Sequence, residues 1–441
     1  MGSLQCPTPS KLQFAVLYMA LALGSLGVGG TRFTIATMGA DQFDKPKDQE
    51  MFFIWYFLAL YLANAISLTA IIYIQDNVSW GVAFVICVVA NAIALILFLS
   101  GKRFYRRIKP NGNPFVRLLC VGFAAFQKRN VSGTFGYQDY NYGSIEAANI
   151  LKDGPSNRFR FLTRAALKTE SDDTQSSGSN AKSWKLCTVE EVEDLKTILK
   201  IMPLWSSNIL LSTTIGMLNN LSVLQVLTMD RHLGPHFKIP AGSFVVFNLL
   251  AMALSILIID RFLHPIWKKF IPHWTLTPLR RIWIGHVINI IAMIGSVLIE
   301  MRRLHAVRTN HLTKQPSSVV PISSLWLAVP LTIVGISEGF HFPGQIVLYY
   351  QGFPKSLKNT STAMIALLIG IGYYASTGII DLVRRTTGWL PDNLNDGRMD
   401  NVYWLLAAIG GVNLGYHLVC AKLFKHENIE KPNDPVGDLP N

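Results

Sequence analysis

One acidic residue stands inside the apolar stretch from Leu325 to Gln351, which reads LWLAVPLTIVGISEGFHFPGQIVLYYQ. The stretch is long enough to cross a bilayer, which takes about 20 mostly apolar residues. The acid is Glu338, and a carboxylate at membrane depth costs roughly 2.5–3.5 kcal/mol on insertion scales. Glu338 should therefore face a protein interior or a water-filled cavity and bind a proton or an ion there. The alternative is a structural ion pair between helices.

Further side chains inside apolar runs have types that suit a transport pathway. Arg32 could hold an anionic substrate, bridge to an acid, or extend toward the cytoplasmic face. Asn219 could line a pocket or form hydrogen bonds between helices, which are worth about 0.6 kcal/mol each. Tyr373 and Tyr374 could line a pocket or pack in the core. His341 could line the pathway or hydrogen-bond within the helix packing.

The composition is typical of a membrane protein. Of the 441 residues, 50% are hydrophobic and only 15% are charged, whereas a soluble domain carries about a quarter charged residues. The net charge is +13. Much of the excess lies between Lys102 and Lys200, which indicates a cytoplasmic loop rather than a nucleic-acid-binding protein. The five cysteines have no paired spacing, and GxSxG, HExxH and P-loop motifs are missing, so we expect no enzyme, no metal site and no cofactor.

Nine apolar runs predict an all-α bundle with nine membrane-spanning helices. An odd number puts the two ends of the chain on opposite sides of the membrane. The positive-inside rule then puts the long basic segment and the C-terminus in the cytoplasm and the N-terminus outside. Arg302, Arg303, Arg308 and Lys314 would lie outside, against that rule. The expected spans are Leu12–Met38, Phe52–Tyr73, Trp80–Leu99, Leu195–Leu218, Ala241–Leu263, Ile282–Glu300, Leu325–Gln351, Thr362–Leu382 and Asn401–Phe424.

The segment between the third and fourth spans is polar but carries two helix signals. Phe115–Lys128 has apolar residues at helical spacing, which predicts an amphipathic helix lying on the membrane or on the bundle. Thr188 with Glu191 three residues later forms a capping box, which predicts a helix start that leads into the fourth span. The apolar face of the first helix is expected to comprise Phe115, Leu118, Leu119, Gly122, Phe123 and Phe126.

Ordered motifs along nearly the whole chain resemble the plant nitrate/peptide transporter (PTR, proton-dependent oligopeptide transporter) family. GVGGTRF with MGADQFD (27–44) is similar to the family's fourth helix and the loop that follows it. YIQDNVSW, FRFLTRAAL, WKLCTVEEVEDLK and TMDRHLG are similar to its plant members. SGKRFYRR, FKIPAGSF, FHFPGQ and RTTGWLPDNLNDGRMDNVYW resemble the nitrate excretion transporter-like subgroup.

The resemblance implies a bundle of the major facilitator superfamily, truncated at the N-terminus, in which this chain lacks the first three helices and the proton-coupling ExxER motif. It implies four parts: residues 1–101 as a partial N-terminal bundle, 102–194 as a cytoplasmic linker, 195–425 as a six-helix C-terminal bundle, and 426–441 as a cytoplasmic tail.

Site roles carry over from the family residue by residue. Arg32 stands where the family has a lysine, and an arginine suits an anion as a bidentate partner. Glu338 matches the acid of the family's tenth helix and would couple protons. Ile215 stands where some nitrate-transporting relatives have a nitrate-binding histidine, and Asn219 stands at a nearby hydroxyl position. The expected site is thus Arg32, Asn219 and Tyr374 for substrate, Glu338 for protons, and His341 and Ile215 along the pathway.

The implied function is secondary transport of small anions, nitrate or chloride, by alternating access with proton linkage. The partners would be the anion, protons and the lipid bilayer, and the location a multi-pass position in the plasma membrane. The alternative is a truncated, transport-inactive member of the family that acts as an interaction partner or is a pseudogene product. Because this chain lacks the first three helices and the ExxER motif that couples protons in the family, we expect little uphill anion uptake by the chain alone. Passive anion flux can still occur.

Overall fold

The computed structural model describes residues 10–106, 114–131, 136–143, 155–156, 159–168, 186–235, 237–270, 276–315, 318–354, 357 and 360–429. Arg32 lies in a described helix, but its side chain is outside the described part. The expectations for Arg32 as an anion partner therefore stay predictions.

In the described residues, nine helical stretches are long and apolar enough to cross a membrane, which confirms the all-α fold with nine spans. Several are longer than expected; the sixth continues nine residues past Glu300. They are α1 (Lys11–Ala40), α2 (Pro46–Ile66) with α3 (Ile72–Asn77), α4 (Trp80–Ser100), α9 (Val189–Leu227), α10 (Val246–Ile258) with α11 (His264–Phe270), α12 (Pro278–Thr309), α13 (Ala328–Gly352), α14 (Ser361–Thr386) and α15 (Met399–Ile429).

Two of these spans contain a π turn, a local insertion into the helical hydrogen-bond ladder. Residues Ser67–Ile71 (η1) join α2 to α3, and Ile259–Leu263 (η6) join α10 to α11. The hydroxyl of Ser243, in the 3-10 turn that precedes α10, donates to the carbonyl oxygen of Leu68 at 2.8 Å. The π turn of the second span is therefore tied to the start of the fifth.

Contacts divide the chain into two units, Met1–Leu60 with Ala90–Arg107, and Tyr61–Val89 with Ile108–Asn441. In the first unit, the backbone N–H of Arg106 donates to the side chain of Gln42 at 2.8 Å, and Arg106 pairs with Asp44. The loop after α1 is thus joined to the end of α4. The described side chains along α1 up to residue 31 are exposed, as suits an apolar helix whose solvent is lipid.

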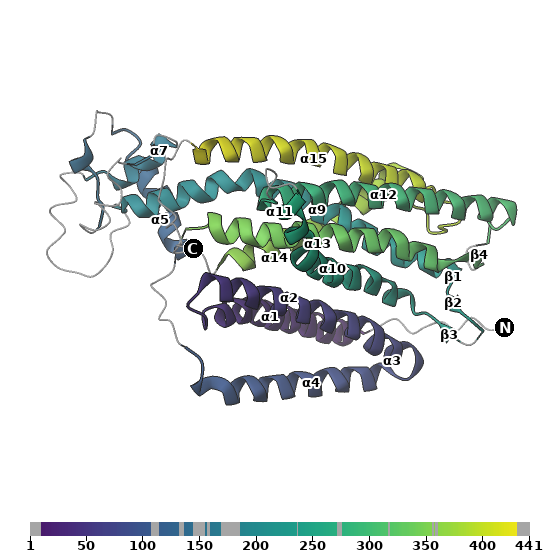
Figure 1. The fold of residues 1–441 in the computed structure, drawn as a ribbon. Helices are drawn as coiled ribbons and strands as arrows, with labels where there is room; N and C mark the ends of the chain where they lie inside the picture. The colour runs from purple at the N-terminus through teal and green to yellow at the C-terminus, as the bar shows by residue number, and fades with distance from the viewer. Residues whose placement is uncertain are drawn as a thin grey trace. The chain divides into compact units, whose positions relative to one another are not determined.

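The second unit contains a bundle in which α13 packs against both α10 and α12, α12 against α15, and α9 against α14 and α15 (Figure 1). Glycines allow these close approaches. A Cβ atom at Gly335 would overlap the carbonyl oxygen of Asn248 on α10, and one at Gly285 would lie 2.9 Å from the Cβ of His341. The apolar core of this bundle includes Ile215, Leu218, Met293, Val334 and Leu406.

Short strands follow the C-terminal end of α9. Strand β1 (Met229–Asp230) pairs in parallel with β4 (Val320–Ser323), and β2 (His232–Leu233) forms an antiparallel pair with β3 (Phe237–Lys238). The backbone N–H of Val320 also donates to the carbonyl oxygen of Thr228 at 2.9 Å. The β1–β4 pair and this bond join the end of α9 to the chain that leads into α13.

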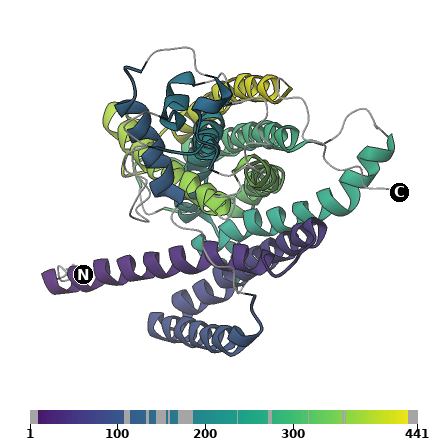
Figure 2. The same cartoon turned by 90° about the vertical axis from the view of Figure 1, so that its left-hand side faces the viewer.

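The polar linker has an apolar core of its own, which the sequence did not reveal. Helix α5 (Pro114–Gln127) packs on α7 (Arg160–Thr163), on the turn η4 (Arg164–Ala166) and on the first turns of α9, over one end of the bundle (Figure 2). The expected capping box is confirmed: the hydroxyl of Thr188 accepts from the Glu191 backbone at 3.3 Å. The residues buried in this core include Cys120, Val121, Ala124, Ala125, Leu162, Ala165 and Val192.

Helix α5 turns its small residues, not its large apolar face, toward that core. Phe115, Leu119, Phe123 and Phe126 are all exposed. The expected amphipathic helix is confirmed, but the face that packs on the protein is the one bearing Cys120 and Ala124. Large rings would not fit between α5 and α9 at the close spacing that cysteine and alanine allow.

Polar groups lock the linker onto α9. The ammonium of Lys196 is buried and donates to the carbonyl oxygen of Ser156 at 2.8 Å, to the hydroxyl of Thr163 at 2.8 Å, and to Glu193 at 2.9 Å. Each of its three donors thus has an acceptor. Burial in this core raises the pKa of the Cys187 thiol to about 12, which keeps it protonated and unreactive.

Candidate functional site

Glu338 lies in the middle of α13 with its side chain buried. The side chain of Asn248, on α10, hydrogen-bonds to its carboxylate. This contact depends on Gly335, which lets α10 and α13 approach within backbone contact at Asn248. Among the described side chains no ion pair involves Glu338, so a structural ion pair gains no support from them.

Helices α9 and α14 complete a polar group around this carboxylate. The amide of Asn219 hydrogen-bonds to the hydroxyl of Tyr373, and that hydroxyl lies close enough to Glu338 to interact electrostatically with its carboxylate. The buried amide oxygens of Asn219 and Asn248 have no hydrogen-bond partner in the described part of the chain. The group therefore offers free acceptors beside a carboxylate, an arrangement that can hold a protonated acid. We call Glu338, Asn248, Asn219 and Tyr373 the Glu338 site.

The structure brings together only some of the residues expected from the sequence. Tyr374 is 84% exposed, whereas Tyr373 is 39% exposed and hydrogen-bonds to Asn219, so the tyrosine in the site is Tyr373. Adjacent helical residues point about 100° apart, and the sequence of two tyrosines does not say which one turns inward. Ile215 is buried in the apolar core of the bundle.

His341 belongs to a different group. Three residues after Glu338 along α13, its ring contacts that of His286 on α12, which in turn stacks on the ring of His417 on α15. Sequence reasoning missed both of these histidines and Asn248. A signal was available for Asn248, since it is the one amide side chain in the apolar run FVVFNLLAMALSILI. The histidines lie 55 and 76 residues from His341, and sequence spacing alone could not group them.

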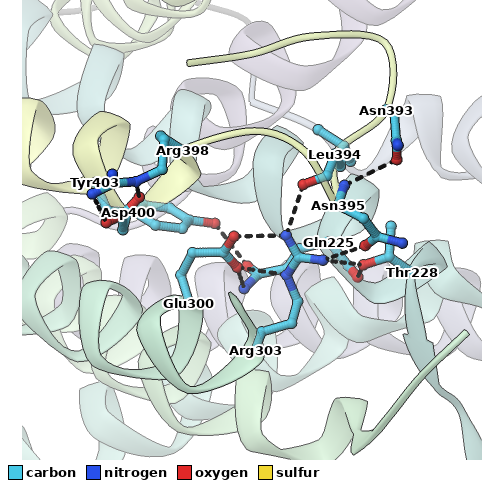
Figure 3. Close-up of polar contacts among 10 residues, drawn as sticks. All are labelled: Gln225, Thr228, Glu300, Arg303, Asn393, Leu394, Asn395, Arg398, Asp400 and Tyr403. Carbon is cyan, nitrogen blue, oxygen red and sulfur yellow. Dashed lines mark hydrogen bonds and ion pairs between the residues drawn. The ribbon is translucent and has the colours of Figure 1, made fainter. Parts of the chain in front are cut away.

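A second group of buried charges lies toward the C-terminal end of α12 (Figure 3). Glu300 and Arg303 are both 0% exposed, and their side chains form a bidentate ion pair at 2.7 and 2.8 Å. The guanidinium also donates to the carbonyl oxygen of Leu394 at 3.0 Å, to Asn395 at 2.8 Å and to Thr228 at 3.2 Å. Gln225 donates to Glu300 at 2.6 Å and accepts from Tyr403 at 2.9 Å.

This network corrects the expectation that Arg303 lies in an outer loop. Because α12 continues to Thr309, Arg303 stands on a helix, where Glu300 neutralises it. Arg302 stacks its guanidinium 4.6 Å from the ring centroid of Trp326. Two of the four cations that opposed the positive-inside rule are therefore engaged in contacts within the bundle.

The close approach at Gly335 gives a direct test of the packing that holds the Glu338 site. Gly335→Ala should lower the stability of the purified chain by about 1–3 kcal/mol, because overpacking separates α10 from α13. The measurement is thermal or denaturant unfolding in detergent. Gly370→Ala on α14 is the matched control, since nothing lies within 4 Å of a Cβ atom there. Equal stability of the two variants would contradict the close approach.

Comparisons with known proteins agree with this architecture. The model of the POT family (PTR2) matches residues 2–395. The chain is 49% identical over 429 residues to Protein NRT1/ PTR FAMILY 2.7 of Arabidopsis thaliana, which covers 97% of this chain and 75% of the relative. It is 48% identical to Protein NRT1/ PTR FAMILY 2.6 of the same plant, over 96% of this chain and 74% of the relative.

A solved structure supports the fold. The crystal structure of an auto inhibited POT family peptide transporter superposes with a TM-score of 0.57 at 16% identity, over 94% of this chain and 77% of that one. At that identity the likeness concerns the fold alone. Together with the family match and the plant relatives, the nine spans and the bundle around Glu338 show that this chain is a multi-pass membrane protein belonging to the POT family of transporters.

Proposed function

We propose that the chain moves small anions, nitrate first and chloride second, across the plasma membrane, with proton binding at Glu338 linked to anion binding. The observation that supports this proposal is a buried carboxylate that is held by an amide donor and has no cationic partner among the described side chains. Such an acid inside a membrane bundle is a functional group by default.

The linkage follows from electrostatics. Two unit charges about 4 Å apart repel by roughly 4 kcal/mol at an effective dielectric constant of 20. Anion binding beside an ionised Glu338 would therefore lose about a thousandfold in affinity. A proton on the carboxyl group removes that penalty, so each ligand favours binding of the other by the same factor.

The remaining polar groups would orient the anion. The amides of Asn219 and Asn248 and the hydroxyl of Tyr373 carry the donors that a planar oxyanion requires. Arg32, on α1, is a further proposed partner of the anion, and this proposal rests on the family resemblance alone. Alternating access would then expose the Glu338 site to one side of the membrane at a time.

The test is anion flux down an imposed gradient into vesicles that hold the purified chain. We expect nitrate flux, and a smaller chloride flux, above the rate of protein-free vesicles, with faster flux at acidic pH. A labelled dipeptide is the control substrate and should not enter. Anion rates equal to those of protein-free vesicles would overturn the proposal in favour of a transport-inactive interaction partner, and dipeptide entry would contradict the substrate class.

A further inference from the structure

Helix α5 has one face of large apolar side chains that no described part of the protein covers. The members of this face recur at intervals of four, four and three residues, which places them on one side of the helix. Their side chains are between 50% and 67% exposed, although they are phenylalanines and a leucine. We call this the exposed face of α5; it comprises Phe115, Leu119, Phe123 and Phe126.

The helix lies where spans of the bundle end. The apolar spans of α13 and α15 end at Tyr349 and Phe424. On α5, Leu118 packs against the apolar cluster that contains Tyr349 and Phe353, and Phe424 packs against the same cluster. Figure 1 likewise shows α5 at the end of the bundle that holds the C-terminal ends of α13 and α15. Because these spans are apolar up to that end, α5 lies at the level of the membrane surface.

Arginines gather at the C-terminal end of α5. The guanidinium of Arg129 lies 4.4 Å from the ring centroid of Phe126, at the edge of the exposed face. The guanidinium of Arg164 donates to the backbone carbonyl oxygen of Arg129, and Arg160, four residues earlier, is exposed. In the described part of the chain, none of the three arginines forms an ion pair with a carboxylate. Like charges this close repel one another, so the group favours an anionic partner.

The charge of the linker as a whole points to the same kind of partner. The linker has six lysines and arginines and one aspartate in its described segments, 114–131, 136–143, 155–156 and 159–168. Its polar stretch TESDDTQSSGSNAKS has no large apolar side chain that could cover the exposed face. An amphipathic helix with aromatic rings on one face and cations at its border is typical of a helix that lies in the headgroup region of an anionic bilayer.

We propose that α5 binds an anionic phospholipid surface, with its exposed face among the acyl chains and with Arg129, Arg160 and Arg164 on the lipid phosphates. Arginine suits this role because a guanidinium can bond to two phosphate oxygens at once. Its apolar stem can also lie along a buried ring while its charge stays at the headgroups. The other side of α5 packs on the first turns of α9, so anionic lipid holds the linker core, and with it the start of α9, at the membrane.

Photo-crosslinking of the full chain in vesicles tests this proposal. Benzoylphenylalanine, a photoreactive analogue of phenylalanine, takes the place of Phe123, and the peptide that contains α5 is analysed by mass spectrometry. We expect phospholipid adducts, and several-fold more of them in vesicles that contain phosphatidylserine than in vesicles of phosphatidylcholine alone. The same probe at Glu190, which is exposed in the first turn of α9, is the control and should give no lipid adduct. If the probe at Phe123 prevents folding, Leu119 is a second position on the exposed face.

The role of the arginines has its own variant. Arg129→Gln with Arg160→Gln should remove most of the difference between the two kinds of vesicle, because each cation near an anionic surface contributes to binding. Arg385→Gln is the matched control, since Arg385 is exposed on α14 and pairs with Asp381, and it should leave the difference unchanged.

Two results would overturn the proposal. Adducts to peptides of this protein in place of lipid would show that another part of the chain, or a second copy, covers the exposed face. Equal lipid adducts in both kinds of vesicle would show that anionic lipid is not the partner. The measurement needs no transport, so its outcome is independent of the anion flux.

Discussion

Arg303→Met should destabilise the purified chain by about 3–5 kcal/mol, the largest effect that we expect from a single substitution. The change removes five hydrogen-bond donors from a site with 0% exposure. It leaves the carboxylate of Glu300 buried with Gln225 as its remaining donor. It also deprives Asn395 and the carbonyl oxygen of Leu394 of their partner, and those groups fix the chain that leads into α15.

Unfolding in detergent, followed by circular dichroism, measures this effect. The matched control is Arg385→Met on α14, which breaks an exposed i,i+4 pair with Asp381 and should cost less than about 0.5 kcal/mol. The double variant Glu300→Leu, Arg303→Met should recover part of the loss, because it leaves no unpaired charge. If Arg303→Met and Arg385→Met are equally stable, the network does not hold this end of the bundle.

Glu338→Gln should make anion flux independent of pH and hold it at the rate that the parent reaches at acidic pH, because a neutral side chain does not repel the anion. Glutamine keeps the shape of the side chain, and it can still bond to Asn248, so we expect the variant to fold. Its neutral amide binds no proton in this pH range, however. The linkage between proton and anion binding, worth about 1.4 kcal/mol for each tenfold change in affinity, is therefore lost. The measurement is the nitrate flux of vesicles at pH 5.5 and pH 7.5.

Asp381→Asn is the control for that substitution. Asp381 is also an acid in a spanning helix, but it is half exposed and pairs with Arg385 at 2.9 Å near the end of α14. Its neutralisation should leave flux and pH dependence unchanged. A Glu338→Gln variant as active and as pH-dependent as its parent would refute the role assigned to Glu338.

The sequence predicted the features that one residue or one short pattern decides. The nine spans follow from hydropathy, the start of α9 from Thr188 and Glu191, and the position of Glu338 from a charge in an apolar run. For α5 the periodicity predicted an amphipathic helix but left open whether its apolar face meets the membrane or the bundle, because periodicity does not show which neighbour a face meets.

Groups assembled from residues far apart in the sequence could not be predicted from local patterns. Arg303 bonds to Asn395, 92 residues away, and Gln225 to Tyr403, 178 residues away. Such partners are chosen when helices pack, and no local pattern marks them. The choice between Tyr373 and Tyr374 likewise depends on the rotation of α14 about its axis, which α9 sets through contact at Gly372 and Gly216.

Helix α9 has a mechanical consequence for this protein. Its 39 residues form one helix from the linker core, where Lys196 is anchored, through Asn219 in the Glu338 site, to the strand pair β1–β4 at its C-terminal end. At 1.5 Å per residue it is a rod about 58 Å long. A displacement of the linker core would therefore move Asn219 in the Glu338 site. Pro203 removes one hydrogen bond of the helix, so the helix can bend there.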